Sequence, residues 1–142
     1  MIRSRIRPLL ALLLLVGLAA CASEPQPYEI RLATEEFELR VTADVLPPRA
    51  VEVTTYTIKV TDLATKQPVV GGEGRLFATN ASGNSIWDGL AYGPEPGTYR
   101  ARLKFLTAGE WAIGLQFRRD STVPLQRTHD WRQLVRNESP ST

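Results

Sequence analysis

In the second half of the chain, residues 99–105 alternate strictly between apolar and basic residues, and residues 111–117 alternate between large apolar residues and small or polar ones. The first reads Tyr-Arg-Ala-Arg-Leu-Lys-Phe and the second reads Trp-Ala-Ile-Gly-Leu-Gln-Phe. A period of two places successive side chains on opposite faces of a strand, whereas a helix would need a period near 3.6. We therefore expect two strands, joined as a hairpin by a turn at 106–110. Large apolar side chains contribute roughly 1.5–3 kcal/mol each when buried, so this hairpin is expected to be the energetic centre of the domain.

Shorter segments of the same kind surround the expected hairpin, and no stretch keeps a helical period. Strands are expected over 37–41, 51–60, 75–79 and 128–135. This pattern predicts an all-β fold with two packed sheets. The stretch 80–97 is rich in Gly, Pro and Asn, and we expect it to hold most of the irregular structure and any binding loop.

The N-terminal segment has the pattern of a secretory signal peptide. Three arginines precede an apolar run at 9–18, and small residues lead to Cys21, the only cysteine of the chain. The segment resembles a bacterial lipoprotein signal, which implies that Cys21 is lipidated and that its acyl chains hold the domain at a membrane surface. A transmembrane anchor is the alternative, but the apolar run is short for a hydrocarbon core of roughly 30 Å.

The resemblance to lipoproteins also predicts a location. Ala22 and Ser23 follow the cysteine, where lipoproteins retained in the inner membrane usually carry Asp. This implies the periplasmic face of the outer membrane. The expected organisation is a signal peptide over 1–20, lipidated Cys21 and a tether over 21–34, a sandwich over 35–136 and a disordered tail over 137–142.

Charge and cysteine content exclude several classes of function. The whole chain carries +2, but removal of residues 1–21 takes three of its 17 basic residues and none of its 15 acidic ones, which leaves 14 against 15. A near-neutral domain has no field to attract nucleic acid, so no nucleic-acid partner is expected. With Cys21 lipidated, no thiol remains for a disulfide or a thiolate metal site.

A corner motif gives the expected sandwich a more specific form. The sequence Glu95-Pro-Gly97-Thr-Tyr99-Arg-Ala101 resembles the corner of immunoglobulin-type sandwiches, with Ala101 where an antibody domain has its second cysteine. This resemblance implies an immunoglobulin-like antiparallel β-sandwich.

Further short motifs extend the resemblance to a family. They are Tyr56-Thr-Ile-Lys-Val-Thr-Asp62, Gln67-Pro-Val69, Gly97-Thr-Tyr99 and Gly109-Glu-Trp-Ala-Ile113. With them, residues 35–118 resemble the YtkA-like and FixH-type family of small exported immunoglobulin-like domains. Some members are linked to copper handling or oxidase assembly, which implies a metal or small-ligand carrier as an alternative function.

The residues of this chain do not favour copper. A soft copper site needs thioether, thiolate or imidazole ligands, and the chain after Cys21 has no methionine and one histidine, His129. The segment 72–84, which carries Met and His in some members, has neither. We expect no metal site and no cofactor. FixH-type proteins are also usually anchored by a membrane helix, so an oxidase-assembly role is not carried over.

Catalytic patterns are equally weak, and we expect no catalytic residue and no enzymatic activity. His129 and Asp130 are neighbours, but adjacent side chains of a strand point to opposite faces and cannot act as a base and its orienting partner. The chain has no Gly-x-Ser-x-Gly, His-Glu-x-x-His or phosphate-loop motif.

The remaining candidates form a partner surface. Arg100, Arg102 and Lys104 are expected on the outer face of one strand, where they either keep the sheet soluble or, with Arg118, contact an acidic partner protein or anionic lipid. Trp87 and Tyr92 in the expected loop either plug the end of the sandwich or anchor an interface. The prediction is a lipid-anchored, non-catalytic interaction module of the cell envelope with an envelope protein partner.

Overall fold

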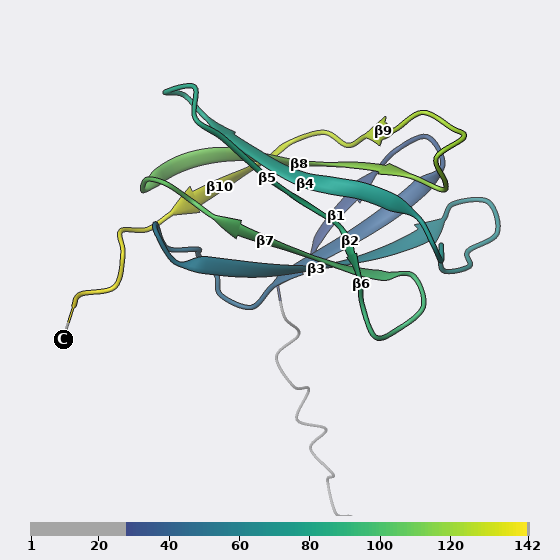
Figure 1. Ribbon diagram of the computed structural model, residues 1–142, viewed down its shortest axis with the longest axis horizontal. Coiled ribbons are helices and arrows are strands. Elements are labelled where there is room, and N and C mark those ends of the chain that lie inside the picture. Colours follow the sequence, from purple (N-terminus) through teal and green to yellow (C-terminus); the bar gives the residue numbers. More distant parts are fainter. Residues whose placement is uncertain (1–27, 142) are drawn as a thin grey trace, which may run out of the picture.

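The computed structural model describes residues 28–141, which form two antiparallel sheets packed face to face. The first sheet has the strand order β1-β2-β3-β7-β6, and the second has the order β10-β8-β4-β5, with β9 also paired to β8. In Figure 1, β4, β5 and β8 run above β3 and β7. The strands are β1 (Ile30–Ala33), β2 (Phe37–Ala43), β3 (Val53–Asp62), β4 (Glu73–Asn80), β5 (Ser85–Gly89), β6 (Ala91–Tyr92), β7 (Thr98–Lys104), β8 (Gly109–Arg118), β9 (Gln126–Arg127) and β10 (Trp131–Val135).

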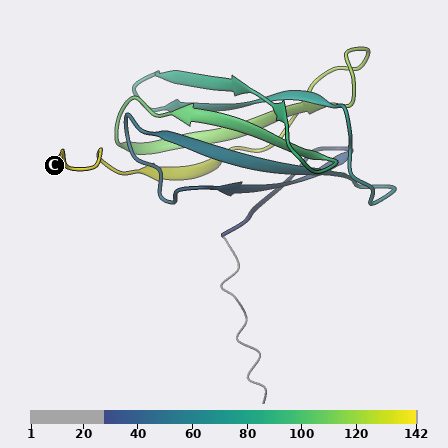
Figure 2. The same ribbon diagram turned by 60° about the horizontal axis from the view of Figure 1, so that its bottom comes forward.

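The fold is an immunoglobulin-like β-sandwich, as the sequence predicts. If β2, β3, β7 and β6 are named A, B, E and D, the first sheet has the order A-B-E-D of immunoglobulin domains. The second sheet then reads G-F-C-C′. The strands of both sheets run along the long axis of the domain (Figure 1; Figure 2).

The core lies between the sheets and consists of the apolar positions of the alternating strands. The pattern correctly predicts the inner faces of β2, β3, β7 and β8. The largest side chains that are fully buried there are Trp111, Tyr56, Tyr99, Phe37, Phe105 and Phe117. The aromatic rings of Phe37 and Phe117 meet edge to face with centroids 5.0 Å apart, so the two sheets interlock through aromatic contacts.

The predicted hairpin at 99–117 is wrong, because its two strands belong to different sheets. β7 pairs with β3, and β8 pairs with β4. The apolar faces of β7 and β8 therefore face each other across the core. Phe105 and Trp111 lie against each other with ring centroids 5.4 Å apart, and Trp111 Nε1 donates to the Thr107 carbonyl at 3.0 Å. These contacts fix the short connection that crosses between the sheets.

The expected loop at 80–97 contains two strands, β5 and β6. The Asn80 side-chain oxygen accepts hydrogen bonds from Ser82 N at 3.1 Å and Asn84 N at 3.0 Å, and this tight turn folds β5 back on β4. Leu90 then carries the chain from β5 in the second sheet to β6 in the first. Trp87 and Tyr92 consequently lie on strands.

The sandwich also starts before the expected boundary at residue 35, since β1 pairs with β2 through Ile30–Ala33. The closing strand is shorter than the predicted 128–135 and begins at Trp131. Beyond β10, residues 137–141 contain no strand, and Ser139 N donates to Glu52 at 2.8 Å. The expected signal peptide, Cys21 and most of the tether lie outside the described residues.

The corner motif lies on a different strand from the one that its resemblance to immunoglobulin domains implies. Tyr99 and Ala101 lie on β7, the E strand, whereas the second cysteine of an antibody domain lies on strand F. The Tyr99 hydroxyl donates to the Val69 carbonyl at 2.6 Å and accepts from Gly72 N at 2.9 Å. The side chain thus fixes the connection between β3 and β4, 27 to 30 residues upstream.

Candidate functional surfaces

The structure divides the predicted partner surface between the two sheets. Arg100, Arg102 and Lys104 project from the outer face of β7 in the first sheet. Trp87 lies on β5 in the second sheet, and Tyr92 lies on β6 at the edge of the first. The side chains of Trp87 and Tyr92 are 65% and 69% exposed, so they do not plug the end of the sandwich.

The cations of β7 belong to a larger group on the outer face of the first sheet. Arg31, Arg40 and Lys59 stand directly opposite one another on β1, β2 and β3. We call the whole group the basic face, which consists of Arg31, Arg40, Lys59, Arg100, Arg102 and Lys104. Arg31, Arg40 and Lys59 were not among the residues predicted from the sequence for the partner surface. The outward position of Lys59 nevertheless follows from the alternation of residues 56–60.

Charge compensation on the basic face is uneven. Glu29 pairs with Arg31 at 3.1 Å, and Glu38 pairs with Arg40 at 3.4 Å. In the part of the chain that the structure describes, Lys59 and the three cations of β7 make no ion pair. The expectation that Arg118 joins them is wrong, because Arg118 lies on β8 in the other sheet and pairs with Glu73 at 2.9 Å.

One carboxylate covers the edge of β7 where the short strand β6 no longer reaches. Asp88 on β5 accepts a hydrogen bond from Arg102 N at 2.7 Å. Uncovered backbone groups of an edge strand are a template for pairing with another chain. Asp88 therefore occupies one such group and also links the edges of the two sheets.

The outer face of the second sheet carries a cluster of rings and guanidinium groups. Trp87 lies opposite Phe77 on the neighbouring strand β4. The guanidinium carbon of Arg75 lies 5.9 Å from the Trp87 ring centroid, and that of Arg127 lies 4.6 Å from the Phe77 ring centroid. Arg75 Nε also donates to Gln116 Oε1 at 2.6 Å, which fixes its position. We call Arg75, Phe77, Trp87 and Arg127 the aromatic cluster.

A shallow apolar hollow lies beside the third candidate, Tyr92. Its ring lies 5.9 Å from that of Tyr99. The turn between β6 and β7, with Pro94 and Pro96, and the segment at Val70 complete a space of about 260 Å³. This is slightly smaller than typical small-molecule sites, which begin at roughly 300 Å³.

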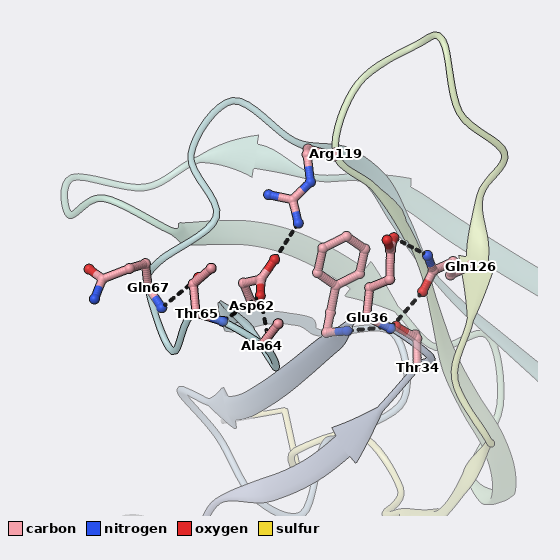
Figure 3. A network of polar contacts seen from close by, with 9 residues as sticks. Thr34, Glu36, Asp62, Ala64, Thr65, Gln67, Arg119 and Gln126 are labelled. Atoms are coloured by element: carbon pink, nitrogen blue, oxygen red, sulfur yellow. Dashed lines mark hydrogen bonds and ion pairs between the residues drawn. The ribbon is translucent and has the colours of Figure 1, made fainter.

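A polar network at one end of the sandwich joins the turns rather than forming a cleft. The Asp62 carboxylate accepts hydrogen bonds from Ala64 N and Thr65 N, at 2.8 and 2.9 Å, and pairs with Arg119 (Figure 3). The backbone N–H of Thr65 and the Arg119 guanidinium hold the pKa of Asp62 below its usual range. Figure 3 also shows the side chains of Glu36 and Gln126 in contact, which connects the β1–β2 turn to β9.

The residues considered for chemistry are dispersed. His129 is exposed and precedes β10, and the Asp130 carboxylate pairs with Arg127 at 3.2 Å. Among residues 28–141, no group of three or more His, Cys, Asp or Glu side chains is arranged to hold a metal ion. The same residues include no helix of the length and hydropathy that a membrane crossing requires.

Comparisons of the chain with protein-family models, with curated proteins and with solved structures gave no match. The fold and the two surfaces are therefore the basis for the functional argument.

Proposed function

We propose that the protein is a lipid-anchored, non-catalytic contact module of the cell envelope, held at the periplasmic face of the outer membrane by Cys21. The signal-like segment before Cys21 supports the anchor. An immunoglobulin-like sandwich with exposed recognition side chains on a sheet face supports the contact role. In this proposal the chain is a relative of the YtkA-like and FixH-type domains that acts by binding another envelope protein.

The aromatic cluster is the observation that carries the contact role. Trp, Tyr and Arg are the residues that most often dominate the binding energy of protein interfaces. Trp87 is well exposed, and its backbone is part of a sheet, so little entropy is lost when a partner covers the ring. The stacked Arg75 already holds a cation against this ring, which gives the surface a fixed shape for a partner.

The test is covalent capture of partners from intact cells that carry the native lipoprotein. Trp87→Ala is expected to reduce the captured partner at least tenfold, because truncation of an interface hot spot costs about 2 kcal/mol or more. Tyr92→Ala is the matched control, since it removes an equally exposed aromatic side chain from the other sheet. Equal capture by the native protein and the Trp87 variant would contradict the assignment of the surface.

The anchor has its own test. Cys21→Ser is expected to release the protein from the membrane fraction, because the proposed acyl chains on that residue hold the domain there. An unchanged unfolding transition is the control for folding. Membrane association that persists in a processed Cys21→Ser protein would contradict lipid anchoring.

A small-ligand carrier is the second candidate, and the hollow beside Tyr92 is the observation that favours it. An apolar ligand seated there is expected to raise the unfolding midpoint of the native protein by mass action. A Val70→Trp change at the rim, where the native side chain is already exposed, is expected to fill the hollow and abolish that shift. Titration with Cu(I) tests the copper-carrier alternative, and tight stoichiometric binding would favour it over the contact module.

A further inference from the structure

The basic face concentrates charge that the sheet itself does not neutralise. Like charges directly opposite on neighbouring strands destabilise a sheet, and Arg31, Arg40 and Lys59 form such a row. Along β7, Arg100, Arg102 and Lys104 follow at intervals of about 7 Å on one face. Only Arg31 and Arg40 have carboxylate partners among the described residues, so the β3 and β7 half of the face is available to negative charge on another molecule.

The second sheet shows that this imbalance is local. Three of the four arginines on its outer face have carboxylate partners on the same sheet or beside it. The pairs are Arg118 with Glu73, Arg127 with Asp130 and Arg132 with Glu110. A domain whose overall charge is close to neutral is thus strongly polarised, with its positive side on the first sheet.

We propose that the basic face docks on the anionic phospholipid headgroups of the membrane that holds the protein. This inference rests on the lipid anchor of the proposed function. The described chain starts at Tyr28, directly before β1 at the edge of the first sheet. Seven residue steps separate Cys21 from Tyr28 and span at most about 25 Å, so the anchor keeps this sheet close to the bilayer.

Apolar side chains at one end of the basic face favour lipid over an acidic protein. Val53 stands opposite Lys104 and is 44% exposed. Val51, whose N–H donates to the Phe105 carbonyl, and the neighbouring Leu106 are exposed beside it. Exposed aliphatic residues next to cations suit a membrane interface, where acyl chains lie directly below the charged headgroups.

The chemistry of the face matches phosphate. Arginine binds phosphate oxygens in a bidentate manner and lysine binds them as a point charge, and the face supplies both. Each basic residue near an anionic surface strengthens binding about fivefold, and the effect falls off within a screening length of roughly 8 Å. The tether, which spans at most about 25 Å, allows the face to come within this length of the bilayer and makes docking an intramolecular event.

The experiment uses the lipidated protein reconstituted into vesicles of phosphatidylcholine, with or without 30% phosphatidylglycerol. Because Cys21 is acylated, an engineered cysteine is the single free thiol. Thr57→Cys carries a fluorophore at the centre of the basic face, opposite Arg100. Thr79→Cys carries it on the outer face of the second sheet. The measurement is quenching of each label by aqueous iodide.

Docking predicts that the label at residue 57 is protected at least threefold from iodide in anionic vesicles and is unprotected in neutral ones. The label at residue 79 should be quenched equally in both. Arg100→Glu with Arg102→Glu should abolish the protection, and 0.5 M salt should reduce it. Lys66→Glu with Arg136→Glu is the control, since it makes the same change in net charge at two exposed sites away from the face, and it should preserve protection.

Three outcomes would overturn the proposal. Equal quenching at residue 57 in both kinds of vesicle excludes charge-driven docking. Protection that survives reversal at Arg100 and Arg102 excludes the basic face as its cause. Protection that needs an added acidic envelope protein assigns the face to that protein instead. In all three the protein stays on the vesicle, whereas loss of the protein from both kinds of vesicle would refute the anchor of the proposed function.

Discussion

Two buried tyrosines of the core differ in one respect that predicts opposite effects of the same substitution. The Tyr99 hydroxyl makes two hydrogen bonds, to Val69 O and from Gly72 N. The Tyr56 hydroxyl is equally buried but has no hydrogen-bond partner among the residues that the structure describes. Tyr99→Phe and Tyr56→Phe each remove one oxygen atom and leave the ring in place.

The expected magnitudes follow from what each hydroxyl does. Tyr99→Phe loses two hydrogen bonds, at about 1 kcal/mol each, and leaves Gly72 N or Val69 O buried without a partner at a cost of about 1–3 kcal/mol. We expect a loss of roughly 3–5 kcal/mol in the free energy of unfolding. Tyr56→Phe removes a buried polar atom that gains nothing from the fold, so its effect should be neutral or stabilising by up to about 1 kcal/mol.

Urea denaturation followed by circular dichroism measures both values. The slope m should be the same in all three proteins, so that midpoints report stability alone. A Tyr56→Phe loss as large as the Tyr99→Phe loss would contradict this prediction, since it would mean that an unpartnered hydroxyl stabilises the core. So would a Tyr99→Phe protein as stable as the native one.

The pH dependence of the free energy of unfolding provides a second test of the burial of the same two tyrosines. Burial raises the pKa of Tyr99 and of Tyr56, and the charge of Asp44 adds to the effect at Tyr56. Above about pH 10 the unfolded chain releases tyrosine protons that the folded chain retains, so stability falls as pH rises. Each Tyr→Phe variant should lose less stability than the native protein between pH 9 and 11.

Three further predictions concern packing and charge. Trp111→Ala should lower the free energy of unfolding by about 3–5 kcal/mol in the same denaturation assay, because the ring is fully buried. Gly74→Ala should cost about 1–3 kcal/mol, since an added Cβ would lie 2.1 Å from the Gln116 carbonyl oxygen, whereas Gly89→Ala meets no atom within 4 Å and should cost little. Stability should fall as pH drops below about 4, where the lowered pKa of Asp62 makes protonation costly, and Asp62→Asn should weaken that dependence.

The alternation of residues was sufficient to predict the inner faces of the sandwich. The core positions of β3, for example, follow from Tyr56, Ile58 and Val60 alone. Alternation identifies the face of a strand but not its neighbour. For this reason β7 and β8 looked like a hairpin, although both arrangements place the same side chains in the core. The decisive contact, Trp111 Nε1 on the Thr107 carbonyl, lies within the connection and has no periodic signal.

The edge strand β5 escaped prediction for a related reason. Its inward positions are Ile86 and Asp88, and its largest apolar residue, Trp87, faces outward. An edge strand needs only part of an apolar face, so its pattern is too weak to separate it from a loop. The same strand explains why the aromatic cluster was missed, since Trp87 and Phe77 become neighbours only through the pairing of β4 with β5.

The edges of the two sheets favour contact through faces over strand addition. Asp88 occupies the Arg102 N–H at one edge. At the β10 edge of the second sheet, Ala50 N donates to the Arg136 carbonyl and Arg136 N donates to the Pro48 carbonyl, both at 2.8 Å, so the end of β10 is covered as well. At these two places, a partner that adds a strand would have to displace these bonds, whereas the basic face and the aromatic cluster are accessible without any rearrangement. Because the two faces lie on opposite sides of one sandwich, docking of the first on a membrane would leave Trp87 directed toward the periplasm, where a protein partner could reach it.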